Sequence, residues 1–187
     1  MVSIWNQSKR TKTYIAGDWD GDFDAVQQLM KWNSSKYWGL NFVDVHEATV
    51  SSDDSLNCSI KRSLCQRMSI SKTFLLIVGD HTKSLRSGAC YLCSKHVSFP
   101  ILHCLNGYTF LDGRSYVDYE CCLAKNSYDA GKIKIVVLYN STVKHIYKCP
   151  TILQGVGTHL AMKKWVTDIY GFRRLEWNYQ AIKDAIE

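Results

Sequence analysis

The sequence predicts an α/β domain in which helices cover both faces of a central, mainly parallel sheet of about five strands. Strand-like and helix-like segments alternate along the chain, as they do when helical crossovers join parallel strands. Two strand-like segments, residues 73–79 (TFLLIVG) and 133–139 (IKIVVLY), are almost continuously apolar, which is typical of strands buried on both faces. The length of 187 residues, 46% of them apolar, suits a single domain with a substantial core.

Three further segments complete the expected sheet. Residues 12–17 (KTYIAG) form its first strand and lead into an acidic turn, residues 18–22 (DWDGD). Residues 40–45 (LNFVDV) form the second strand. Both contain β-branched and aromatic residues, which favour strands. Residues 156–162 are the candidate for a fifth strand after residues 133–139.

Two helices are expected before the apolar strand at residues 73–79. The first is capped by Asp20 or Asp22 and has apolar residues at helical spacing. These residues are Phe23, Val26, Leu29, Met30 and Trp32. The second follows a capping-box pattern in residues 51–54 (SSDD), and its apolar stripe recurs every four residues. That stripe consists of Leu56, Ile60, Leu64 and Met68.

A third helix is defined by both of its ends. Ser115 and Asp118 form a capping-box pattern at its start, and Gly131 is a suitable C′ residue at its end. One face of this helix carries Tyr116, Glu120, Leu123 and Ala124. Beyond the strand at residues 133–139, Pro150 is expected to open a short helix, and residues 177–187 to form a closing helix.

The segment from about residue 82 to residue 112 is too long for a simple connection, because connections in parallel sheets rarely exceed about 15 residues without structure of their own. It contains a C-x-x-C motif with further soft ligands nearby. Cys90, Cys93, His96 and Cys104, with His103 beside them, could hold a structural zinc ion that stabilises this insertion. Unligated thiols are the equally weighted alternative.

The charge pattern excludes some functions. The formal net charge is +6, but the basic residues are scattered and no nucleic-acid-binding motif is present, so we expect no nucleic-acid partner. The amino terminus (MVSIWNQSKRTK) lacks the apolar region of a signal peptide, and no window approaches the ~20 apolar residues of a membrane span. We therefore expect a cytoplasmic protein with reduced thiols and no membrane partner.

Glu120 is the first candidate for a catalytic residue. It lies in the second turn of the third predicted helix, on the face that is expected to contact the sheet, where a carboxylate is costly unless it has a use. Ligands of open parallel sheets bind outside the carboxyl ends of the strands, which is where this helix begins. The alternative is a surface glutamate near a helix N-terminus, where the helix dipole favours it.

Other polar residues are expected at the same edge of the sheet. The acidic turn after the first strand lacks the glycines of a phosphate-binding loop, but Asp18 could bind ribose hydroxyls while Trp19 or Phe23 stacks on a base. Asp44 and His46, which follow the second strand, would face the same rim. The alternative is that the aspartates cap a helix and the aromatic residues pack in the core. A magnesium-binding receiver domain built on Asp18, Asp20 and Asp80 ranks low, because Asp80 is displaced past Gly79.

The order of these motifs resembles the bacterial Toll/interleukin-1 receptor (TIR)-like family that includes Thoeris ThsB-like antiphage proteins. The resemblance covers roughly residues 12–140 and rests on TYIAGDWDGD, NFVDVHE, SKTFLLIVGDHT, RSYVDYECCLA and KIVVLYN. It implies a flavodoxin-like, three-layer fold and an active-site glutamate that matches Glu120. It also implies cleavage of the nicotinamide–ribose bond of NAD+ in antiphage defence, with Asp18, Trp19, Phe23, Asp44, His46 and Tyr116 as substrate-binding residues.

From the resemblance we expect one TIR-like domain over residues 1–187, with a core at 12–140, an insertion at about 82–112 and an extension at 150–187. The product would be ADP-ribose or a cyclic or conjugated derivative that a separate effector senses, and the protein would be a homo-oligomer. Two alternatives remain. One is a non-catalytic TIR-like module that acts by self-assembly, and the other is an enzyme related to nucleoside deoxyribosyltransferases.

Overall fold

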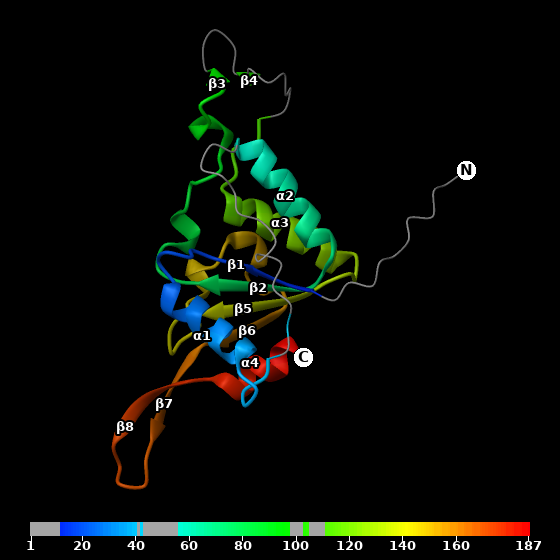
Figure 1. Cartoon of the computed structure of the whole chain (residues 1–187). Coiled ribbons are helices and arrows are strands. Elements are labelled where there is room, and N and C mark those ends of the chain that lie inside the picture. The colour runs from blue at the N-terminus through cyan, green and yellow to red at the C-terminus, as the bar shows by residue number, and fades with distance from the viewer. Residues whose placement is uncertain (1–11, 41, 43–55, 98–102, 105–110) are drawn as a thin grey trace, which may run out of the picture.

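The computed structural model describes residues 12–40, 42, 56–97, 103–104 and 111–187, and its α/β architecture agrees with the prediction (Figure 1). Within these residues the central sheet has four strands, all parallel, in the order β1-β2-β5-β6. They are β1 (Lys12–Ala16), β2 (Ser71–Val78), β5 (Lys134–Tyr139) and β6 (Thr158–Ala161). The predicted strands at residues 12–17, 73–79, 133–139 and 156–162 are therefore confirmed, with ends that differ by one or two residues.

Helices cover both faces of this sheet, which gives the molecule three layers (Figure 1). Helices α2 (Asn57–Ser69) and α3 (Tyr116–Asp129) lie on one face, and α1 (Phe23–Ser34) and α4 (Tyr179–Ile186) on the other. Because side chains alternate along a strand, Tyr14 packs toward α2 and α3 whereas Ile15 packs toward α1 and α4. The sheet thus separates two apolar cores.

The ends of α3 agree with the sequence pattern. Ser115 is the N-cap, and its hydroxyl oxygen accepts a hydrogen bond of 3.1 Å from the backbone N–H of Asp118. Gly131 follows the last turn with a φ of +66°, a left-handed conformation that glycine adopts without a Cβ clash. These two signals mark where α3 begins and where it ends, and the start at Ser115 places Glu120 in the second turn of the helix.

The prediction that an aspartate side chain caps α1 is wrong. Asp22 does occupy the N-cap position, but its side chain makes no capping hydrogen bond. It accepts one of 3.0 Å from Asn140 Nδ2 instead, at the end of β5. The expected capping box of the second helix, at residues 51–54, lies outside the described residues, where α2 is seen from Asn57 onward.

Two antiparallel strand pairs lie outside the central sheet. The short pair β3 (His96–Val97) and β4 (His103–Cys104) falls within the predicted insertion, whose status as a separate unit stays a prediction. The longer pair, β7 (Lys163–Thr167) and β8 (Arg173–Trp177), was not predicted and projects from the domain (Figure 1). The closing helix therefore begins at Tyr179, because Trp177 is the last residue of β8.

Three further predictions concern the segment after Pro150, the second strand and membrane-spanning helices. Pro150 does precede a short helical turn, Thr151–Leu153. The second predicted strand, residues 40–45, lies mostly outside the described residues; Leu40 and Phe42 are described, and both are buried against the α1 side of the sheet. In the part of the chain that the structure describes, no helix is long and apolar enough to span a membrane.

Candidate active site

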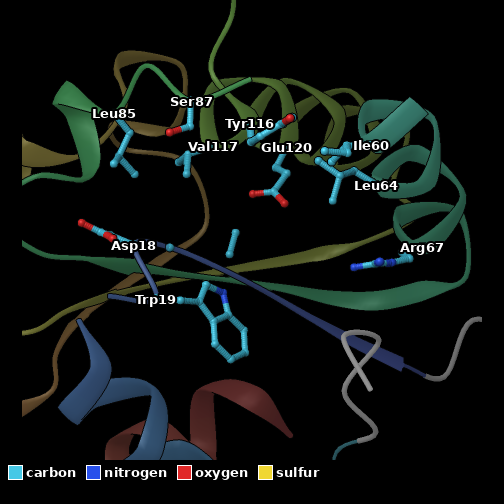
Figure 2. A pocket seen from close by; sticks show the side chains of 12 residues that line it. Asp18, Trp19, Ile60, Leu64, Arg67, Leu85, Ser87, Tyr116, Val117 and Glu120 are labelled. Carbon is cyan, nitrogen blue, oxygen red and sulfur yellow. The ribbon is translucent and has the colours of Figure 1, made fainter. Parts of the chain in front are cut away.

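A cavity of about 460 Å³ lies between the sheet and the pair of helices α2 and α3 (Figure 2). It extends from the turn after β1 to the last turn of α2. Its walls come from the end of β1 and its turn, from α2, from the loop after β2 and from the first two turns of α3. The lining residues are Ala16, Gly17, Asp18, Trp19, Ile60, Leu64, Arg67, Leu85, Ser87, Tyr116, Val117 and Glu120.

Glu120 is buried in the wall of this cavity, with 6% of its surface exposed. Figure 2 shows its carboxylate directed from α3 toward the sheet. The hydroxyl of Tyr14 on β1 donates a hydrogen bond of 2.5 Å to Glu120 Oε1. The burial predicted for this residue is confirmed, and the alternative of a surface glutamate is wrong. A buried carboxylate is tolerated only where hydrogen bonds replace water, and Tyr14 supplies one of them.

The turn after β1 brings Asp18 and Trp19 to the same cavity (Figure 2). Asp18 shapes this turn, because its Oδ1 accepts a hydrogen bond of 3.1 Å from the backbone N–H of Gly21. The Trp19 ring is 37% exposed and lines the cavity, so it is not a core residue. An indole that lines a cavity can stack on a planar group bound there.

Tyr116 forms another part of the wall and is fixed on three sides. Its backbone N–H donates to Ser87 O over 2.7 Å, and its hydroxyl donates to Asn57 Oδ1 over 2.8 Å. Gly88, with a φ of +95°, lies so close beneath the ring that a Cβ there would overlap it. Burial raises the pKa of the Tyr116 hydroxyl, which therefore stays protonated at neutral pH.

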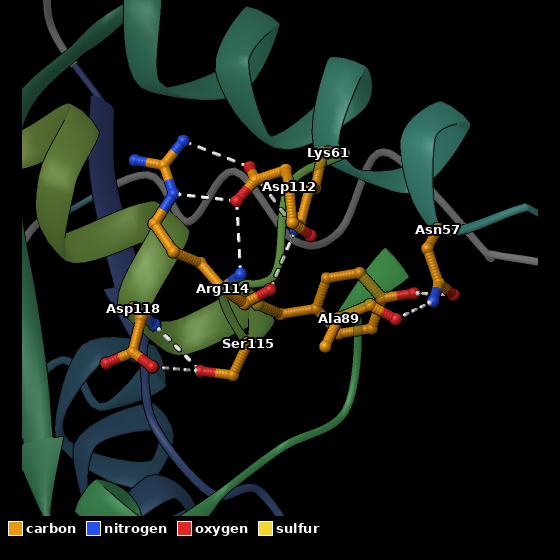
Figure 3. A network of polar contacts seen from close by, with 8 residues as sticks. Asn57, Lys61, Ala89, Asp112, Arg114, Ser115 and Asp118 are labelled. Atoms are coloured by element: carbon orange, nitrogen blue, oxygen red, sulfur yellow. Dashed lines mark hydrogen bonds and ion pairs between the residues drawn. The ribbon is translucent and has the colours of Figure 1, made fainter. Parts of the chain in front are cut away.

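A polar network joins α2 to the start of α3 and holds this wall in place (Figure 3). The Lys61 ammonium donates to the backbone carbonyls of Asp112 and Arg114, over 3.2 and 2.7 Å, and lies 3.3 Å from Asp112 Oδ2. The Arg114 guanidinium donates to both Asp112 carboxylate oxygens, over 2.8 and 3.0 Å. Burial on its own raises the pKa of Asp112, but these partners hold it below its ordinary value.

A second, smaller hollow of about 230 Å³ lies at the carboxyl ends of β1, β2 and β5 and contains the carboxylates Asp18, Asp22 and Asp80. Asp22 is only 3% exposed, and burial, reinforced by the neighbouring carboxylates, raises its pKa even though Asn140 donates to it. Among the described residues no group of three potential ligands could hold a metal ion. The hollow therefore gives no support to a magnesium-binding receiver site.

The predicted substrate-binding residues are only partly brought together. Asp18, Trp19 and Tyr116 line the cavity of Glu120. Phe23 does not, since it lies 58% exposed on α1 and lines a different hollow together with Trp19. Asp44 and His46 lie outside the described residues, so their placement stays a prediction.

The zinc prediction has no support in the part of the chain that is described. Cys90 and Cys93 are half-buried free thiols. The side chains of His96 and Cys104 are outside the described set, and no metal-binding group of three was found among the others. All seven cysteines whose side chains are described are free, and their reduced state stays a prediction.

The sequence analysis missed two polar residues of the site: Arg67, which lines the cavity, and Tyr14, which donates a hydrogen bond to Glu120. Each had a signal: Tyr14 is two residues before Ala16 and so faces the same side of β1, and Arg67 is seven residues after Ile60 and so shares its face of α2. Both patterns predict the face of the strand or helix on which the residue lies, but not which residue it contacts. That Tyr14 meets Glu120, 106 residues away, follows only from the folded structure.

Comparison with protein families gives a match over part of the chain. No curated protein matches the chain. Residues 14–87 match a family described as the Thoeris protein ThsB, TIR-like domain. This segment runs from Tyr14 in β1 to Ser87 and includes Asp18, Trp19 and Arg67, but it ends before Tyr116 and Glu120. The match, together with the parallel α/β fold, supports the assignment of this chain to a Thoeris ThsB-like TIR family.

Proposed function

We propose that this protein is a TIR-like enzyme that cleaves the nicotinamide–ribose bond of NAD+ as part of antiphage defence. The observation that carries the proposal is the buried Glu120 carboxylate, held by the Tyr14 hydroxyl in the wall of a cavity that Asp18, Trp19 and Tyr116 also line. A cavity of about 460 Å³ is within the usual range for small-molecule sites. The family match supports a defence-related TIR protein.

The geometry suits the chemistry of N-glycosidic cleavage. When this bond breaks, its electron pair moves to the nicotinamide nitrogen, nicotinamide leaves as a neutral molecule, and positive charge develops on the ribose. A carboxylate in a partly desolvated cavity stabilises that charge more strongly than one in water, and this is the role that we assign to Glu120. The Tyr14 hydroxyl keeps the carboxylate oriented, and Trp19 provides a face for the nicotinamide ring.

The second half of the reaction needs a nucleophile. A water molecule whose oxygen bonds to the ribose C1′ and releases a proton gives ADP-ribose. A nitrogen of the adenine base or an added nucleophile gives a cyclic or conjugated product instead, which a separate effector could sense. The cavity is not fully enclosed, so an external nucleophile can enter.

The test is release of nicotinamide from NAD+, followed by mass spectrometry, with the protein alone and with lysate from phage-infected cells. We expect Glu120→Gln to reduce the rate by at least about 100-fold, the usual effect of removing an electrostatic stabiliser of a transition state. Asp129→Asn is the matched control, because Asp129 lies on the same helix but is 55% exposed and pairs with Lys125. Equal rates in wild type and Glu120→Gln, or no nicotinamide under either condition, would contradict the proposal.

A TIR-like self-assembly module is the second candidate, and one observation favours it. The tip of the β7–β8 hairpin exposes Ile169, Tyr170 and Phe172, with 91%, 79% and 73% of their surfaces accessible. Exposed apolar clusters of this kind often mark interaction sites. If the module is the function, light scattering will show assembly that Tyr170→Ser with Phe172→Ser abolishes, and nicotinamide will not be released. Base exchange with nucleosides in place of NAD+ cleavage would indicate a deoxyribosyltransferase-like enzyme.

A further inference from the structure

The end of the cavity opposite Asp18 and Trp19 is formed by Arg67 (Figure 2). Arg67 belongs to the last turn of α2 and lies on the same face as Ile60 and Leu64, which also line the cavity. In Figure 2 its guanidinium points from α2 into the cavity, and across the view Glu120 lies between Arg67 and Asp18. The cavity therefore has a cation at one end and carboxylates in its middle and at its other end.

The Arg67 guanidinium is an incompletely satisfied donor. Its Nε is buried and has no hydrogen-bond partner within the described residues. Two neighbouring cations, Lys61 and Arg114, differ in this respect, because both pair with Asp112. A buried donor on a charged group is costly unless an acceptor reaches it, and in a cavity that acceptor can be a ligand.

The position of Arg67 in the helix does not explain this arrangement. A cation in the last turn of a helix is favoured by the helix dipole, and that effect accounts for a basic residue at this place in α2. It acts equally on a side chain that extends into solvent. It does not account for a guanidinium that points into the cavity while its buried Nε has no acceptor among the described residues.

We infer that Arg67 forms a phosphate-binding subsite that holds the diphosphate of a dinucleotide substrate. The inference rests on the proposed NAD+ chemistry and extends it. NAD+ carries a positive pyridinium ring on one ribose and a negative diphosphate on the other side of that ribose. The cavity has the complementary order, with Asp18 at the turn after β1, Glu120 in the middle and Arg67 at the far end. A guanidinium offers parallel N–H donors that match phosphate oxygens.

The subsite makes the site selective for phosphorylated substrates. Nicotinamide riboside has the same scissile bond as NAD+ but no diphosphate, so it gains nothing from Arg67. Discrimination between the two substrates therefore depends on this residue. Because the contact is made equally before and during bond cleavage, its loss raises KM for NAD+ and leaves kcat largely unchanged.

Binding of ADP-ribose, measured by calorimetry, tests the subsite without any turnover. We expect Arg67→Gln to weaken binding of ADP-ribose by about 10- to 100-fold, the range for a lost hydrogen bond to a charged group. The affinity of Arg67→Lys should lie between those of wild type and Arg67→Gln. Arg62→Gln is the matched control, since Arg62 is an exposed residue of the same helix that does not line the cavity. Equal affinities for wild type and Arg67→Gln, or no binding of ADP-ribose to wild type, would overturn the inference.

Two further measurements separate this inference from the proposed function and from a folding defect. Arg67→Gln removes a buried donor that has no partner among the described residues, so its melting temperature should equal or exceed that of wild type. If ADP-ribose binds through Arg67 but no nicotinamide is ever released, the subsite stands and the proposed function fails. If nicotinamide is released and KM for NAD+ is unchanged in Arg67→Gln, the function stands and the subsite is refuted.

Discussion

Replacing Lys61 by methionine should destabilise the protein strongly, because this lysine joins α2 to the segment that starts α3. Lys61 is 4% exposed, and its ammonium donates to two backbone carbonyls and pairs with the Asp112 carboxylate (Figure 3). Methionine keeps most of the apolar stem, so the variant removes mainly the polar contacts.

The magnitude follows from those contacts. A hydrogen bond to a charged group contributes about 1.5–3 kcal/mol, and removing one partner of a buried ion pair costs about 3–5 kcal/mol when the other charge is left alone. Here Asp112 is not left alone, because Arg114 still donates to both of its oxygens. We therefore expect a loss of about 2–4 kcal/mol in the free energy of unfolding, and a fall in melting temperature of roughly 5–15 °C for a domain of this size.

Urea unfolding at neutral pH, followed by circular dichroism, measures this loss. Arg62→Met is the control, since it removes a cation from the neighbouring, exposed position of the same helix. The double variant with Asp112→Asn should show a coupling energy of about 1–3 kcal/mol, because the two residues are in direct contact. A loss below about 1 kcal/mol in Lys61→Met, or additive effects in the double variant, would refute the assignment of the network as a stabilising joint.

Two other predictions concern ionisable side chains. Burial raises the pKa of Asp22, so the folded state favours its protonated form; that stability is fully present below the unfolded pKa of about 3.9 and is lost as the pH rises through the folded pKa. Asp22→Asn should thus raise the melting temperature at pH 7 by roughly 2–4 °C but have little effect at pH 3, and a lower melting temperature at pH 7 would contradict this account. Burial also raises the pKa of the Cys149 thiol to about 11 and that of Cys121 well above its ordinary value, whereas Cys65 is exposed. Iodoacetamide at pH 8 should therefore modify Cys65 first, as peptide mapping by mass spectrometry would show, and early modification of Cys121 or Cys149 would contradict their burial.

The regular elements of the described core were largely predictable from sequence. β2 and β5 are buried on both faces, so selection for burial leaves continuous apolar runs that are visible without a structure. The ends of α3 were equally clear, because the Ser115 cap and Gly131 act through bonds within a few residues of each other. Local interactions of this kind depend on residues that are close together in the sequence, so the sequence alone predicts them.

The β7–β8 hairpin was missed for the opposite reason. Its apolar residues are mostly exposed and do not alternate with polar ones in the way that marks a half-buried strand. The usable signal was its turn, where the Asp168 carboxylate accepts from the backbone N–H groups of Tyr170 and Phe172, and Gly171 adopts a φ of +86°. An Asp-x-x-Gly turn between two aromatic-containing segments could have indicated a hairpin.

The cap of α1 shows where local reasoning fails. An aspartate just before a helix ordinarily caps it, and Asp22 has that position. Its carboxylate instead accepts from Asn140, which is 118 residues away in sequence. Asp22 can reach Asn140 because β1 and β5 both end at this edge of the sheet, with β2 between them. No local sequence pattern encodes that strand order.

The sequence by itself determined the elements of the described core and the inward face on which Glu120 lies, because those depend on periodicity and on capping between near neighbours. Only the tertiary structure decided which groups meet that carboxylate. Tyr14 reaches it from β1, and Arg67 shares its cavity from α2, because the strand order β1-β2-β5-β6 and the packing of α2 against α3 bring them together. Such contacts join residues that are far apart in the chain, and their pairing is fixed by the packing of the whole domain.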